Sequence, residues 1–123
     1  MGATTRFSDP VPEGSSRRYR TVLKDADGVV IPAASISAIT LTLKDVATAT
    51  VVNSRTNQTV LNANGGTLEA LTGVFTMVFS ALDNVILGTS AYETRRATFK
   101  VTYVGGVENH EVTWPVKALA DVP

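Results

Sequence analysis

Apolar and polar residues alternate along most of this chain with the period of two that a half-buried β-strand shows. The clearest run is 39–44, where an isoleucine and two leucines alternate with two threonines and a lysine. The runs 74–80, 96–104 and 107–117 repeat the pattern, and Trp114 has the phase of its apolar neighbours in the last run. We therefore expect strands that each bury one face, with Trp114 in the core.

Turn-forming residues separate these runs into seven or eight short strands. Asp-Ala-Asp-Gly at 25–28 predicts a hairpin, because the carboxylates can accept nearby backbone N–H groups and glycine can take a positive φ. Gly-Gly at 105–106 predicts a second hairpin. Only 81–87 differs: Leu82, Val85 and Ile86 have helical spacing, which predicts one or two helical turns.

This order of elements predicts an all-β fold, an antiparallel two-sheet immunoglobulin-like β-sandwich with one short helical turn near 81–87. The sandwich domain is expected to span 17–117. Residues 1–16 contain two prolines and no periodicity, which predicts an extended N-terminal arm, either frayed or ordered on a neighbouring subunit. Residues 118–123 are expected to form a C-terminal tail.

Composition narrows the chemistry that the chain can perform. Its 123 residues suit one domain, and the absence of cysteine excludes disulfides and thiolate metal sites. Eleven basic and eleven acidic residues give a net charge of zero, so no nucleic-acid partner is expected. No segment is apolar over the length that a membrane span requires, so no membrane partner is expected.

Catalytic and metal-binding patterns are weak in this sequence. His110 is the only histidine, and its place after a Gly-Gly turn is interpreted as an exposed strand end. Asp25 and Asp27 resemble the start of a calcium loop, but apolar residues follow where further ligands are needed. We therefore predict no catalytic residue, cofactor, metal site or small-molecule substrate; a glycosidase with paired acids is the least favoured hypothesis.

Basic residues gather in two clusters, near residue 18 and near residue 95. Each is interpreted as a solvated strand edge or as a salt-bridge set at a protein interface, because the planar guanidinium pairs well with carboxylates. A phosphate-binding patch is the less favoured alternative, because the net charge is zero. With two residues of the N-terminal segment, they give the candidate interface: Arg6, Phe7, Arg17, Arg18, Arg20, Arg95 and Arg96.

The order of turns and strands also resembles a known family. The segments that carry the resemblance are Leu23-Lys24-Asp25-Ala26-Asp27-Gly28-Val29-Val30-Ile31-Pro32, Ile39-Thr40-Leu41-Thr42-Leu43-Lys44-Asp45, Asn64-Gly65-Gly66, Leu82-Asp83-Asn84, Glu93-Thr94-Arg95-Arg96-Ala97 and Tyr103-Val104-Gly105-Gly106. Over about 17–117 the chain resembles small immunoglobulin-like virion proteins of tailed bacteriophages, and it is similar to the N-terminal module of phage baseplate upper proteins.

The resemblance implies a non-enzymatic structural protein, made in the bacterial host cytoplasm and located in the virion. Its place would be the tail or baseplate, the head–tail junction, or the capsid surface as a decoration. Its partners would be other virion proteins and copies of itself, reached through strand faces, sheet edges and the N-terminal arm. The alternative hypothesis is a carbohydrate- or receptor-binding β-sandwich module that uses Tyr92 and Trp114.

Overall fold

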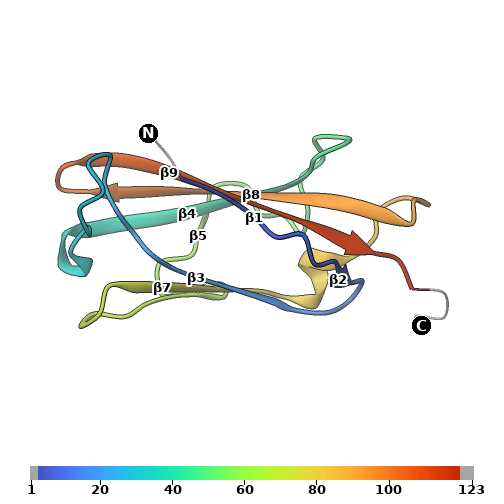
Figure 1. Cartoon of the computed structure of the whole chain (residues 1–123), viewed down its shortest axis with the longest axis horizontal. Helices are drawn as coiled ribbons and strands as arrows, with labels where there is room; N and C mark the ends of the chain where they lie inside the picture. The colour runs from blue at the N-terminus through green and yellow to red at the C-terminus, as the bar shows by residue number, and fades with distance from the viewer. Residues whose placement is uncertain (1–2, 120–123) are drawn as a thin grey trace.

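The computed structural model describes residues 3–119, and its core is formed by two β-sheets packed face to face (Figure 1). The larger sheet, sheet A, has the order β1 (Ala3–Arg6), β9 (Gly106–Lys117), β8 (Tyr92–Tyr103), β4 (Ile36–Asp45) and β5 (Gln58–Thr59), and β2 (Val11–Pro12) also pairs with β9. The smaller sheet, sheet B, has the order β3 (Arg17–Val22), β7 (Val74–Phe79) and β6 (Gly66–Leu68). Two 3₁₀ turns, η1 (Ala33–Ser35) and η2 (Ala81–Asn84), complete the described elements.

The strand order is that of an immunoglobulin-like sandwich. β4, β8 and β9 occupy the positions of strands C, F and G, while β3, β7 and β6 occupy those of strands B, E and D. All pairs are antiparallel except those of β1 and β2, which run parallel to β9. The predicted fold class is therefore confirmed.

The helical turn is shorter than the 81–87 segment predicted for it. η2 covers only Ala81–Asn84, and Val85 already has extended backbone angles. Leu82, expected on the buried face, is 64% exposed, whereas Asp83 and Asn84 are buried. The apolar spacing was misleading here because this turn buries its polar side.

Aromatic rings join the two sheets at the centre of the core. The centre of the Phe99 ring on β8 lies 6.0 Å from the ring centre of Tyr19, 5.5 Å from that of Phe75 and 6.2 Å from that of Phe79. Tyr19 on β3 and Phe99 on β8 occupy the two strands that a disulfide bridges in antibody domains. Trp114 packs 4.4 Å from Phe79 and is 1% exposed, which confirms its predicted place in the core.

The N-terminal segment belongs to sheet A over its described part. Thr5 pairs with Val112 and Val11 pairs with Val116, so both short strands extend the sheet beyond β9. Phe7 packs edge-on against Tyr19, with ring centroids 6.3 Å apart. The predicted arm is thus a sheet edge, because these apolar side chains reach the core. Residues 1–2 of the arm and 120–123 of the tail lie outside the described residues.

The predicted turn at 25–28 forms as expected. Asp25 accepts, through Oδ1, hydrogen bonds from the backbone N–H groups of Asp27 and Val29 at 2.9 and 3.0 Å. Gly28 has φ +78° and donates its N–H to the Asp25 carbonyl at 3.0 Å. The Asp25 carboxylate therefore closes the turn through these two hydrogen bonds.

Candidate functional site

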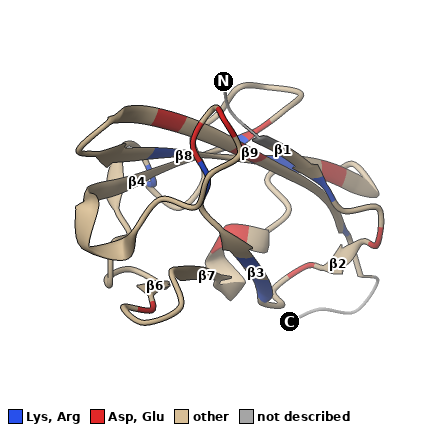
Figure 2. Ribbon diagram, turned by 60° about the vertical axis from the view of Figure 1, so that its left-hand side comes forward, with Lys and Arg blue, Asp and Glu red and all other residues tan. Residues whose placement is uncertain are grey.

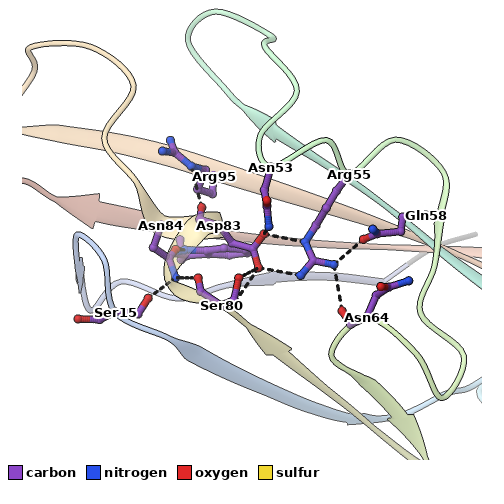
Figure 3. A network of polar contacts seen from close by, with 10 residues as sticks. Ser15, Asn53, Arg55, Gln58, Asn64, Ser80, Asp83, Asn84 and Arg95 are labelled. Carbon is purple, nitrogen blue, oxygen red and sulfur yellow. Dashed lines mark hydrogen bonds and ion pairs between the residues drawn. The ribbon is translucent and has the colours of Figure 1, made fainter.

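A buried cluster of polar side chains centres on Asp83, whose side chain is fully shielded from solvent (Figure 3). Arg55 donates to both carboxylate oxygens, from Nε at 2.6 Å and from Nη2 at 3.0 Å. Asn53 donates its amide to Oδ1 at 2.9 Å, and the Ser80 backbone N–H donates to Oδ2 at 2.7 Å. Asp83 therefore links the loop after β4 to the turn after β7.

The remaining donor of Arg55 fastens a third segment to this cluster. Its Nη1 donates to Gln58 Oε1 at 2.6 Å and to the Asn64 carbonyl at 3.0 Å (Figure 3). A buried ion pair of this kind contributes most when its remaining hydrogen-bonding capacity is also satisfied. The cluster therefore fixes the loops at this end of the sandwich.

Asn84 extends the cluster to the N-terminal segment and to β9. Its Nδ2 donates to the Ser15 carbonyl at 2.7 Å, and its Oδ1 accepts the Trp114 indole N–H at 2.8 Å. The backbone N–H of Gly14 donates to the Asn84 carbonyl at 2.9 Å. The Trp114 ring is thus held inside the molecule, which removes it from the sugar-stacking role considered for it.

Arg95, a candidate interface residue, is also part of this interior. It is 0% exposed and donates to Asp45 Oδ1 and to the Asp83 carbonyl, each at 3.2 Å. It also pairs with Glu93 Oε1 at 3.0 Å and donates to the Val85 carbonyl. The interface assignment of Arg95 is therefore wrong. Arg95 lies two residues before the buried Ala97 on β8, so both side chains point to the same inward face. This alternation was the sequence signal for the burial of Arg95.

The other candidate interface residues do not form one site. Arg6 and Arg96 lie on the outer face of sheet A, whereas Arg18 and Arg20 are exposed on β3. The remaining two pack on each other: the Arg17 guanidinium carbon lies 3.9 Å from the centre of the Phe7 ring.

Arg17 also contacts the segment between β1 and β2. Its Nη1 donates to the Asp9 carbonyl at 3.1 Å. Loss of hydration lowers the pKa of Arg17, and the charge of Asp9 partly opposes that shift. The guanidinium Nε is buried and has no hydrogen-bond partner among the described residues.

His110 is buried rather than exposed as the sequence predicted. It is 6% exposed, shares its face of β9 with Val112 and Trp114, and pairs in register with Phe99. Both ring nitrogens lack a hydrogen-bond partner among the described residues. Desolvation lowers the pKa of His110, and the negative charge of Glu108 opposes this only in part.

The burial of His110 predicts a loss of stability on mild acidification. Its pKa in the folded protein lies below the ordinary value of 6.5, so below about pH 6.5 the unfolded chain binds more protons than the folded one. The free energy of unfolding should therefore fall as the pH drops from about 7 towards the folded-state pKa. Urea unfolding at about pH 7.5 and about pH 5.5 measures this change.

The matched control for this prediction is His110→Leu, which keeps an apolar side chain at the site and cannot titrate. It should lose less stability than the wild-type protein between the two pH values. An equal loss in both proteins would contradict the assignment to His110.

The outer face of sheet A carries rows of threonines and cations across its strands. One row is Thr42, Thr98, Glu111 and Thr4; its neighbours are Lys44, Arg96, Thr113 and Arg6 on one side, and Thr40, Lys100 and Asn109 on the other. Two open hollows of about 370 and 470 Å³ lie on this face and share Arg96 and Glu111 in their linings. The three rows carry four cations and one carboxylate.

A larger hollow of about 590 Å³ lies beside Tyr92, which is 54% exposed. Its lining includes the carboxylates of Asp45 and Glu93, and both are paired with Arg95. Glu93 also accepts the backbone N–H groups of Leu87 and Gly88, at 2.9 and 2.8 Å. These acids hold loops in place, so they do not form the free pair that glycoside hydrolysis uses.

Residues 3–119 contain no group of three or more histidine and acidic side chains placed to hold a metal ion. Within the same residues, no helix has the length and apolar character needed to cross a membrane.

No protein-family model matches the chain, and no curated protein matches it. Among solved structures, the chain is similar to the M1 domain from titin at 12% sequence identity and a TM-score of 0.42. The alignment covers 98% of this chain and 95% of that domain. The class of protein, an immunoglobulin-like sandwich, rests on the strand order described above.

Proposed function

We propose that this chain is a non-enzymatic structural protein of a tailed-phage virion, made in the host cytoplasm and assembled on the particle by contact. The resemblance of residues 17–117 to small virion proteins supports the location. Partners are other virion proteins and further copies of this chain. The proposal includes three positions in the particle: the tail or baseplate, the head–tail junction, and the capsid surface.

The observation that carries the proposal is the outer face of sheet A. Its threonines are short and uncharged, so a neighbouring protein can approach closely without burying many unpaired charges. Lys44, Arg96, Arg6 and Lys100 outnumber Glu111 on this face, which favours a partner surface that carries carboxylates. Symmetric repetition of such a contact on a particle strengthens weak individual contacts.

Mass spectrometry of purified particles from the strain that encodes this chain tests the proposal. We expect the chain at a fixed copy number relative to the major capsid protein. The variant Lys44→Glu/Arg96→Glu should reduce incorporation about tenfold, because it reverses the charge of the face. The matched control is Lys24→Glu, an exposed lysine outside sheet A that should leave incorporation unchanged. Absence of the wild-type chain from particles would overturn the proposal.

A carbohydrate- or receptor-binding module remains the second candidate, and the exposed ring of Tyr92 beside the 590 Å³ hollow favours it. Its signature would be glycan-array binding that Tyr92→Ala abolishes. Trp114, the other aromatic residue considered for this role, is buried and bonded to Asn84.

A further inference from the structure

Strand β3 forms one end of sheet B and has a neighbour on one side only. It pairs with β7 over all six residues, and no strand within residues 3–119 pairs with its other side. Immunoglobulin-type sandwiches of the constant kind carry a fourth strand, strand A, at this position. Here β1 and β2 pair with β9 on the opposite sheet, so the fourth position beside β3 is vacant among the described residues.

The outward side chains of β3 give this vacant position a positive charge. Arg18 and Arg20 are exposed at alternate positions, and they pair in register with the uncharged Val78 and Thr76 of β7. Figure 2 shows basic residues, in blue, on β3. Side chains of an added strand would lie about 5 Å from those of β3 on the same face. Carboxylates at alternate positions of that strand would pair with the two arginines.

The inward face of β3 is covered by the chain itself at Arg17. The Arg17 guanidinium packs on the Phe7 ring and donates to the Asp9 carbonyl. The contacts offered to an added strand are therefore those of Arg18 and Arg20.

A second copy of β3 is a poor occupant of this position. Antiparallel pairing of β3 with itself would place arginines opposite arginines, and like charges directly opposite each other destabilise a sheet. The long strands of this chain that contain acidic residues are β4, β8 and β9, and each of them is already paired on both sides. The charge pattern therefore favours a different protein.

We propose that the free edge of β3 binds an extended acidic segment of another protein by strand addition. The segment completes sheet B as a fourth strand, with backbone hydrogen bonds providing affinity and Arg18 and Arg20 selecting carboxylates. This inference goes beyond the virion role, because it specifies a surface and a partner chemistry that can be tested on the isolated protein.

The probe is a fluorescein-labelled peptide of alternating valine and glutamate, slightly longer than β3, compared with its valine–lysine counterpart. Fluorescence anisotropy should show saturable binding of the glutamate peptide and binding about tenfold weaker for the lysine peptide. Hydrogen exchange should slow in residues 17–22 when the glutamate peptide is bound. Alternate residues of the bound peptide direct their N–H groups towards β3, and the others direct them away. Methylating the backbone nitrogens of the first set should abolish binding, whereas methylating those of the second set should not.

Charge reversal on β3 provides the specific test. Arg18→Glu/Arg20→Glu should reverse the preference, so that the lysine peptide binds more tightly. Arg18→Ser/Arg20→Ser should remove the preference. This variant provides the test if the charge-reversed variant does not fold. The control Lys117→Glu reverses an exposed charge outside β3 and outside the three rows on sheet A, changes the net charge by as much as the serine variant, and should keep the original preference. Equal binding of both peptides to the wild-type protein, or no slowing of exchange in residues 17–22, would overturn the inference.

Discussion

Replacing Asp83 with alanine is expected to lower the free energy of unfolding by about 3–5 kcal/mol, because a buried charged partner is left without its counter-charge. Arg55 would remain nearly buried after the substitution, and Asn53 and the Ser80 N–H would lose their acceptor. Urea unfolding followed by the fluorescence of Trp114, which is bonded to the adjacent Asn84, measures the loss directly.

The control for Asp83→Ala is Glu69→Ala, which removes an exposed carboxylate and should change stability by less than about 0.5 kcal/mol. The double variant Arg55→Leu/Asp83→Leu should recover part of the lost stability, since it removes both charges together. A loss below about 1 kcal/mol for Asp83→Ala would contradict the structural role of the cluster.

Replacing Phe99 with alanine is expected to cost about 3–5 kcal/mol, the range for removing a large aromatic side chain from a core. Phe99 contacts Tyr19, Phe75 and Phe79, so the substitution leaves a cavity between the two sheets. Thermal or urea unfolding gives the measurement. Phe99→Leu, which keeps much of the volume, should cost clearly less.

The control for Phe99→Ala is Tyr92→Ala, because the Tyr92 ring is exposed and lies outside the core. Its effect should stay within about 0.5 kcal/mol. Similar losses for the two alanine variants would show that Phe99 does not have the central role in the core that its contacts indicate.

The sandwich could be predicted from the sequence because alternation and turn chemistry are local signals. Trp114 shares the phase of Val112 and Val116, and all three are buried. The turn at 25–28 depends on residues only a few positions apart, and it formed as predicted. Strands and turns of this kind can be predicted without knowing which strands pair with each other.

The polar cluster could not be predicted, because its partners are distant in sequence. Arg55 and Asp83 are 28 residues apart, and Arg95 and Asp45 are 50 residues apart. For Arg95 and His110 the alternation along the strand indicates an inward side chain. The arginine cluster instead indicated a strand edge or an interface for Arg95, and the Gly-Gly turn indicated an exposed strand end for His110. A buried charge is stable only with its partners, and those become visible only in three dimensions.

The parallel pairing of β1 with β9 has a consequence for how the protein is made. Thr5 lies beside Val112, so β1 leaves the ribosome well before β9, the strand on which it docks. Such distant pairings are slow to form, because the chain must close a long loop before the contact stabilises it. Until translation reaches β9, β1 has no partner strand, and a chaperone or another nascent chain can bind it in that interval.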